Sequence, residues 1–331
     1  MVALHRGPAQ SEDLVGYEQL LDLHVRPAFG NWRVGSITYA DVDAFVRTIE
    51  GLGRKPSTVR NAFFVLKMVL DFAIKDGRLR VNPCAGVELP AARSPEMLFL
   101  TATEVRGLAQ AVDQEVAQKW RSPESEIPPY GLLVEFAAFT GLRAGEIAAL
   151  RTANLDLRAA TLFVARSSSL VRGRWVEGEP KTKAGRRSVF INQALCDRLR
   201  EHLGDRLLDR EGFVFPGRDN GPLNYGSFYS LYFRPAVLAS LPAHLDRLRF
   251  HDLRHTYASL LVEQGAHPKE MAELMGHASV QITLDRYSHV MPRLTAALAE
   301  RLDAAYRAAE PASLVAGRAG ANNPVATLRP G

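Results

Sequence analysis

A proline-rich stretch divides this chain into two parts that have to fold separately. Residues 82–98 contain Pro83, Pro90 and Pro95. Proline lacks the N–H that a helix interior needs, and it disfavours helical geometry in the residue before it, so no regular helix can cross this stretch. At 331 residues the chain is also too long for one ordinary core. The expected divisions are a first domain at 1–81, a linker at 82–98, a second domain at 99–310 and a disordered tail at 311–331.

The first domain is predicted to be entirely helical. Thr38 is followed three residues later by Asp41, which is a capping pattern at the start of a helix. Pro56 stands where proline commonly opens a helix. An earlier helix is expected over residues 14–25. Apolar residues recur at helical spacing after the two starts, at Val42, Phe45, Val46 and Ile49, and then at Val59, Phe63, Leu66, Leu70 and Ala73.

The second domain is predicted to mix helices with short β-strands. Thr101 and Glu104 form a second capping pattern, and the apolar run 130–139 predicts a buried helix that ends near Gly141. The expected β-segments are 161–165, 170–176 around a turn at Gly173, and 188–191. Further helices are expected at 253–263, from Pro268 to Gly276, and from Pro292 through Leu294, Leu298 and Leu302. The fold class is therefore mainly α with a small antiparallel β-sheet (α+β).

Positive charge is concentrated in one part of the chain. The formal net charge is +5 and the sequence pI is about 9.3, which permits a polyanionic partner without requiring one. Residues 166–187 hold seven Lys or Arg and two Glu. This segment is either a solvated hairpin edge or a surface that contacts phosphates.

Cysteine usage and hydropathy favour a cytoplasmic protein. Cys84 and Cys196 lie far apart and match neither a metal-ligand spacing nor a disulfide framework. No apolar run approaches the roughly 20 residues that span a bilayer, and the first residues lack the apolar segment of a signal peptide. No carboxylate cluster resembles a metal site, so neither a metal nor another cofactor is expected.

Several residues of the second domain could take part in phosphate chemistry. Arg143 follows the end of the apolar helix, and Glu146 lies at helical spacing to orient it. His251 and Arg254 share one helical face with His255. Taken singly, these residues have structural interpretations: a surface arginine, a polar helix face, or a histidine pair for a metal.

The last two candidates are also ambiguous when each is considered alone. His277 follows the helix stop at Gly276 and could be a loop residue. Tyr287 lies ten residues later. A free phenol has a pKa of about 10 and is a weak nucleophile unless nearby cations activate it.

Taken together and in this order, the motifs resemble those of the tyrosine recombinases, the phage-integrase family. That family has an arginine at a helix start, a lysine on a β-hairpin turn, a His-x-x-Arg helix, a Gly-His pair and a tyrosine near the C-terminus. The matching positions here are Arg143, the Pro-Lys-Thr-Lys stretch at 180–183, His251 with Arg254, Gly276 with His277, and Tyr287.

The resemblance implies a site-specific DNA recombinase, or integrase, that needs neither metal nor cofactor. Tyr287 would attack the scissile phosphate and form a 3′-phosphotyrosyl link. Arg143 and Arg254 would stabilise the transition state, and His277 would bind the phosphate. The remaining roles implied are Lys181 as the proton donor to the leaving 5′-oxygen with Lys183 as the alternative, His251 for the tyrosine proton, and supporting roles for His255 and His289.

The resemblance also implies partners and an architecture. A helical core-binding domain and a mixed catalytic domain of the integrase type would close around double-stranded DNA. Lys183, Arg186, Arg172 and Arg174 are the expected DNA-binding residues. We expect a monomer in solution and a homo-tetramer on paired sites, in which the last helix docks on a neighbour, with accessory DNA-bending proteins as candidate partners and a nucleoid-associated location. Little sequence precedes the first helix, so an arm-binding module is expected to be absent or truncated.

Two other functions fit part of the same pattern. A type IB topoisomerase-like enzyme shares the chemistry but relaxes supercoils without paired sites. A catalytically inactive DNA-binding regulator would retain the fold without cleavage, although the complete set of motifs argues against it.

Overall fold

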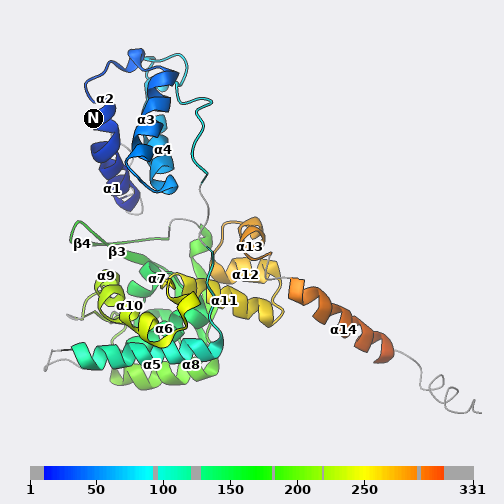
Figure 1. Cartoon of the computed structure of the whole chain (residues 1–331). Helices are drawn as coiled ribbons and strands as arrows, with labels where there is room; N and C mark the ends of the chain where they lie inside the picture. Colours follow the sequence, from blue (N-terminus) through cyan, green and yellow to red (C-terminus); the bar gives the residue numbers. More distant parts are fainter. Residues whose placement is uncertain are drawn as a thin grey trace, which may run out of the picture.

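The protein is described here by a computed structural model that covers residues 11–91, 96–120, 128–180, 183–217, 220–288 and 292–308. These residues form a mainly helical structure with two small antiparallel sheets (Figure 1). The predicted fold class is confirmed. Buried apolar side chains gather in two large cores, one formed between Val25 and Cys84 and the other between Leu100 and Leu253.

The first core is built by α1 (Ser11–Leu20), α2 (Arg26–Phe29), α3 (Tyr39–Gly51) and α4 (Pro56–Lys75). Thr38 caps α3 as predicted, because its hydroxyl accepts from the backbone N–H of Asp41 while Asp41 accepts from the backbone N–H of Thr38. Pro56 occupies the first turn of α4. Both helix starts are therefore confirmed.

The helix predicted at 14–25 is longer and less regular than expected. It starts at Ser11, passes through a π-helical turn at Leu21–Val25, and continues as α2 to Phe29. Pro27 lies in the first turn of α2 and has no N–H to donate, and the wider turn just before it accommodates this loss. The same combination recurs at Tyr229–Phe233, which precedes Pro235 in α10.

The second core contains most of the remaining helices. Thr101 and Glu104 form the predicted capping box at the start of α5. The helices in chain order are α5 (Ala102–Lys119), α6 (Tyr130–Thr140), α7 (Ala144–Ala148), α8 (Gln193–Leu203), α9 (Tyr225–Phe228), α10 (Arg234–Ser240), α11 (Asp252–Glu263), α12 (Pro268–Met275), α13 (Val280–Tyr287) and α14 (Pro292–Ala308).

The β-structure consists of a three-stranded sheet and a separate hairpin. The sheet has the order β1 (Leu155–Asp156), β2 (Thr161–Val164) and β5 (Arg187–Phe190), with antiparallel neighbours. The hairpin joins β3 (Ser167–Val171) to β4 (Arg174–Gly178). Its turn has positive φ at both Arg172 and Gly173, which confirms the turn predicted at Gly173.

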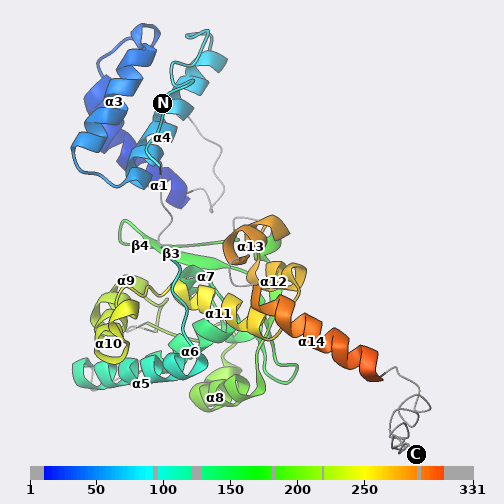
Figure 2. The same ribbon diagram turned by 45° about the vertical axis from the view of Figure 1, so that its right-hand side comes forward.

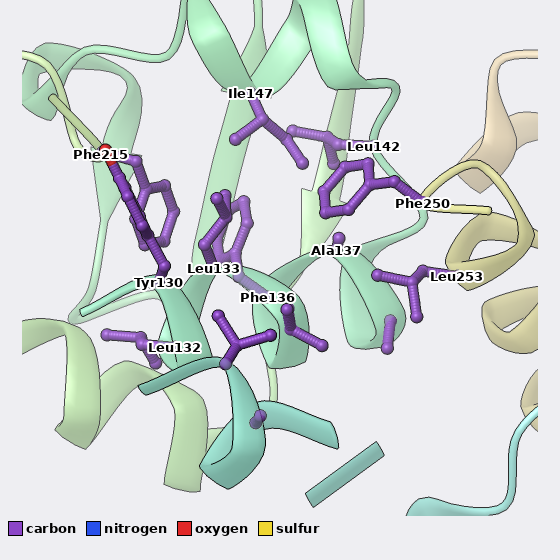
Figure 3. Close-up of a cluster of buried hydrophobic side chains, with 14 of the residues drawn as sticks. Tyr130, Leu132, Leu133, Phe136, Ala137, Leu142, Ile147, Phe215, Phe250 and Leu253 are labelled. Carbon is purple, nitrogen blue, oxygen red and sulfur yellow. The ribbon is translucent and has the colours of Figure 1, made fainter. Parts of the chain in front are cut away.

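The buried helix α6 organises the second core. Its own Leu133 and Phe136 pack in one cluster with Phe215 and Phe250 from later segments of the chain (Figure 3). The helix ends at Gly141 with φ +64°, as the sequence predicted. A Cβ at Gly141 would lie 2.3 Å from the ring of Tyr257 in α11, so only glycine fits this junction. This close approach sets the residues after α6 beside α11.

Helix α14 points away from the body of the molecule (Figures 1 and 2). Leu298, Leu302 and Tyr306 lie along it at four-residue spacing and are 52%, 63% and 71% exposed. The tail predicted at 311–331 lies outside the described residues. Within the described ranges, no helix is both long and apolar enough to cross a membrane.

Candidate active site

Arg143 lies at the start of α7, immediately after the junction at Gly141. Its backbone N–H donates to Glu146 Oε2 at 2.9 Å, and its Nη1 donates to Glu146 Oε1 at 2.9 Å. The side chain of Arg143 is 43% exposed, whereas that of Glu146 is 3% exposed. The partnership predicted from their spacing is confirmed, and it leaves one side of the guanidinium open to a ligand.

Arg254 is buried in α11 and connects two other segments. Its Nη1 donates to the carbonyl of Gly141 at 2.6 Å, and its Nη2 donates to the carbonyl of Met275. These carbonyls belong to the C-terminal ends of α6 and α12, where no helical partner remains for them. Burial, followed by the charge of Arg143, lowers the pKa of Arg254 to about 9. Arg254 thus remains charged at neutral pH.

His277 follows the left-handed Gly276 that ends α12, as predicted. Its Nδ1 is 2.8 Å from the Thr283 hydroxyl. Its Nε2 is buried and makes no hydrogen bond within the described part of the chain. Burial and the charge of Arg254 lower the pKa of His277 to about 3, so the ring is neutral. A buried imidazole nitrogen without a partner is suited to bind a ligand atom.

Tyr287 is the last residue of α13, and its side chain is fully buried. Its hydroxyl is 2.8 Å from Nδ1 of His255. Burial raises the pKa of Tyr287, while the charge of Arg254 acts in the opposite direction. The phenol is therefore protonated at neutral pH and donates its hydrogen bond to His255. The side chains packed around it belong to Tyr257, Ala258, Val262, Met271 and Met275.

His255 is the contact that sequence reasoning did not identify. Tyrosine-proton transfer was predicted for His251, and His255 was given a supporting role. In the structure the rings of His251 and His255 lie 5.2 Å apart and nearly perpendicular. Burial and the neighbouring His251 lower the pKa of His255 to about 4. Because neutral His255 accepts at Nδ1, its proton resides on Nε2.

The basic segment lies on the hairpin and on the turn before β5. Arg172 pairs with Glu18 of α1 at 2.9 Å, and Arg186 pairs with Glu179 at 3.1 Å. Arg174 is exposed on β4. Lys183 begins a short 3₁₀ turn, Lys183–Gly185, which precedes β5. Lys181 and His289 lie outside the described residues, so the predicted proton donor remains a prediction.

A third arginine at the site, Arg187, is buried and was not identified from the sequence. It pairs with Glu146 at 3.0 Å and is 7% exposed. Its inward position in β5 is visible in the strand alternation, because an arginine stands where an apolar residue is expected. This signal could have been found from the sequence.

The arrangement suits attack on a phosphate. Arg143 and Arg254 can bind non-bridging oxygens, His277 offers Nε2, and Tyr287 supplies a hydroxyl nucleophile. Throughout the described ranges, no group of three or more His, Cys, Asp or Glu could hold a metal ion. Cys84 and Cys196 are both buried and free.

Comparison with known proteins identifies relatives of this chain by sequence. Residues 99–293 match the model of the phage integrase family. The ICEBs1 integrase of Bacillus subtilis (strain 168) is 26% identical over 294 residues, which cover 86% of this chain and 75% of the relative. The integrase of Mycobacterium phage L5 is 27% identical over 292 residues, covering 86% and 72%.

Solved structures share the fold. The Tn1549 transposon integrase in complex with a circular intermediate DNA superposes with a TM-score of 0.71 at 21% identity, covering 90% of this chain and 96% of that one. A lambda integrase tetramer bound to a Holliday junction superposes with a TM-score of 0.56 at 21% identity, covering 82% and 71%.

Proposed function

The chain belongs to the phage integrase family and is a tyrosine recombinase, and from this premise we propose how its own residues cut and rejoin DNA. It acts as a site-specific DNA recombinase of a mobile element. The observation that carries the assignment of the site is the position of Arg254, which donates to the carbonyls of Gly141 and Met275, two residues before Arg143 and two residues before His277. Arg143 keeps an exposed side, and Nε2 of His277 has no hydrogen-bond partner within the described residues, while the hydroxyl of Tyr287 is bonded to His255 on the helix that carries Arg254.

The proposed cleavage step balances as one displacement at phosphorus. The Tyr287 oxygen bonds to the phosphate, the bond from phosphorus to the 5′-oxygen breaks, and a 3′-phosphotyrosyl link remains. Arg143 and Arg254 stabilise the charge that develops on the non-bridging oxygens. Lys181 gives a proton to the leaving 5′-oxygen, and a histidine receives the tyrosine proton. Attack by a 5′-hydroxyl reverses these steps and joins the strands.

We propose that the described conformation, in which the phenol is buried, is a resting state. Tyr287 cannot reach a DNA phosphate while its hydroxyl is enclosed and bonded to His255. We therefore place a movement of α13 before attack, in which the phenol leaves His255 and turns toward the two arginines. His251 stands at the start of α11 beside His255 and is the proposed proton acceptor in the moved state.

Double-stranded DNA is the proposed partner. Figures 1 and 2 show the helical unit of α1–α4 on the side of the molecule that carries the β3–β4 hairpin. We propose that the pair between Arg172 and Glu18 opens so that duplex DNA can lie between these parts. Arg172, Arg174, Lys183 and Arg186 would then contact its phosphates. Affinity should fall steeply with salt, because each phosphate contact releases a counterion.

The proposed assembly is a monomer in solution and a homo-tetramer on paired sites. The apolar stripe of α14 has no partner on its own chain among the described residues, and it would dock on a neighbouring protomer as a helix in a groove. Accessory DNA-bending proteins and a cytoplasmic, nucleoid-associated location belong to the same proposal. Deleting the chain after Val290 should preserve binding to a half-site and impair synapsis. Normal recombination by this truncated protein would contradict the docking role.

Covalent capture of DNA tests the proposed chemistry. A pool of nicked duplexes with randomised sequence is incubated with the protein, and linked DNA is recovered, sequenced and resynthesised as a suicide duplex. Tyr287→Phe should form no covalent complex but should bind this duplex nearly as well, because binding rests on many phosphate contacts. Covalent complex formed by Tyr287→Phe would show that another residue is the nucleophile, and Tyr257→Phe would be the next variant to test.

The same duplex, used together with a supercoiled plasmid that carries its sequence, distinguishes the alternative functions. Joining of strands between two sites supports recombination. Covalent complex together with relaxation of supercoils alone would indicate a topoisomerase, and binding without any covalent complex would indicate a regulator.

A further inference from the structure

Arg187 is a charged residue at an inward-facing position of β5, where an apolar residue is expected. In β5, Arg187 and Val189 face the interior, whereas Ser188 and Phe190 face outward. An arginine at an inward position loses its hydration, and this loss is offset only where its donors find partners. The partners of Arg187 therefore explain why an arginine stands at this position.

The guanidinium of Arg187 connects three separate segments. Its Nε donates to the carbonyl of Leu274 at 2.7 Å, and its Nη1 donates to the carbonyl of Gly185 at 3.1 Å. Nη1 and Nη2 also pair with the two carboxylate oxygens of Glu146 at 3.1 and 3.0 Å. Leu274 lies three residues before the proposed phosphate ligand His277. Gly185 ends the short 3₁₀ turn that begins at Lys183, one of the two lysine candidates.

The Glu146 carboxylate is shared between two arginines. It accepts from the backbone and side chain of Arg143 on one side and from Arg187 on the other. Burial raises the pKa of Glu146, but hydrogen bonding and charge from Arg187, with a smaller contribution from Arg143, hold it below its ordinary value. Glu146 is thus ionised, and Arg187 neutralises it. The charge of Arg143 is then left for a ligand.

A second observation ties Arg187 to the bend before His277. A Cβ on Gly276 would lie 2.8 Å from the carbonyl of Ala184 and 2.9 Å from Nη1 of Arg187. The bend therefore packs directly on the turn before β5 and on the guanidinium. Arg187 therefore ties the bend at Gly276 and the turn before β5 to Glu146 of α7.

We propose that Arg187 is a positioning residue for strand cleavage, an inference that rests on the function proposed above. It holds α7, the Lys183–Gly185 turn and the bend before His277 in place, and it neutralises Glu146 so that Arg143 keeps its charge for the DNA phosphate. Removing Arg187 would leave Arg143 as the only described side chain that hydrogen-bonds to Glu146. The carboxylate would then draw the guanidinium of Arg143 away from the phosphate.

The test compares three variants with the wild type on the selected suicide duplex. Arg187→Met removes the charge and keeps much of the volume. The double variant Arg187→Met/Glu146→Gln removes the unpaired carboxylate as well. Arg151→Met is the matched control, because Arg151 pairs with Glu177 at 3.1 Å outside the candidate site. Single-turnover cleavage and DNA binding are measured at temperatures where each variant is folded by circular dichroism.

Arg187→Met is expected to cleave about 10²-fold more slowly, the loss typical of a small displacement of catalytic groups. The double variant should cleave about tenfold faster than Arg187→Met and about tenfold more slowly than the wild type. The Arg151→Met control should cleave at the wild-type rate. Lowering the pH should raise the rate of Arg187→Met relative to the wild type, because the pKa of Glu146 rises without Arg187 and its protonation frees Arg143. A residue that only stabilises the fold would produce no such pH effect.

Wild-type cleavage by folded Arg187→Met would overturn the inference, and so would a double variant no faster than Arg187→Met. Should Arg187→Met fail to fold, the double variant carries no unpaired buried charge and is compared directly with the wild type. Cleavage at the wild-type rate by the double variant would then overturn the inference. Absence of covalent complex from the wild type itself would overturn the proposed function and, with it, this inference.

Discussion

The contact between His255 and Tyr287 predicts how stability depends on pH. We consider His255→Asn, because the Asn side-chain oxygen can lie close to the position of Nδ1 and continue to accept from the phenol. The substitution keeps the hydrogen bond but removes a titrating group. In the folded wild type the pKa of His255 lies at about 4, against 6.5 for an unperturbed histidine.

The sign follows from the lowered pKa. Unfolding exposes a ring that binds a proton below about pH 6.5, whereas the folded protein resists protonation until about pH 4. The stability contribution is therefore complete above the unfolded pKa and is lost as the pH falls from about 6.5 toward 4. Within this window the free energy of unfolding falls by up to about 1.4 kcal/mol per pH unit.

Between about pH 7.5 and pH 5 the loss sums to about 2 kcal/mol, and residual solvent access to the ring reduces it to about 1–2 kcal/mol. Wild type and His255→Asn should therefore differ by this amount in their loss of stability between the two pH values. His277 has a similarly lowered pKa and adds an equal loss to both proteins, so the difference isolates His255.

The assay is urea unfolding followed by tryptophan fluorescence at the two pH values. A Trp32→Phe background removes the signal of the helical unit and leaves Trp120 and Trp175, which both lie in the second unit. His244→Asn is the control, because His244 is exposed in a short turn. Equal losses in wild type and His255→Asn would refute a buried neutral His255. Equal losses would also contradict the description of the Tyr287 phenol as a hydrogen-bond donor to His255.

Three further outcomes test the site. Lys181→Ala should slow cleavage of an ordinary strand by about 10²- to 10⁴-fold. A strand with a bridging 5′-sulfur, which leaves without a proton, should restore the cleavage rate of this variant. If the sulfur rescues Lys183→Ala instead, Lys183 is the proton donor. Arg254→Lys keeps the charge, but a lysine cannot bind two carbonyls and a phosphate together, so the cleavage rate measured by gel should fall about 10²- to 10³-fold. A near-normal rate would show that Arg254 contributes only its positive charge. Gly276→Ala should cost about 1–3 kcal/mol in urea unfolding, because its φ is +65° and the new Cβ would lie 2.8 Å from the carbonyl of Ala184; unchanged stability would contradict the close packing described.

The sequence predicted those parts of the fold that depend on short-range chemistry. The capping pairs that begin with Thr38 and Thr101 and the glycine stops at Gly141 and Gly276 are settled within a few residues, and the structure contains all four. The π-helical turn at Leu21–Val25 was missed because helical periodicity alone does not reveal how the backbone adapts to a proline beyond it.

In the candidate site too, contacts within one helical turn could be predicted, whereas contacts between helices could not. The spacing of Arg143 and Glu146 predicted their contact, because both lie in one helical turn. The partner of Tyr287 could not be predicted, because it depends on how α13 packs against α11. His251 and His255 are four residues apart on one face, and only that packing selects between them. The roles assigned to Lys181 and His251 remain predictions.

The charges of the proposed site favour a transition state over a bound substrate. Arg143, Arg187 and Arg254 face the single carboxylate of Glu146, and the nearby Arg249 and Asp252 neutralise each other at 2.6 Å. Among these groups two positive charges are therefore left unmatched, and burial already lowers the pKa of Arg254. A phosphodiester brings one negative charge, whereas the five-coordinate state formed by attack carries close to two. The excess of cations is thus balanced most fully when the phosphate is reacting, which is the condition for differential binding to accelerate a step. A Glu146 left without Arg187 would neutralise one of those two charges and weaken this preference.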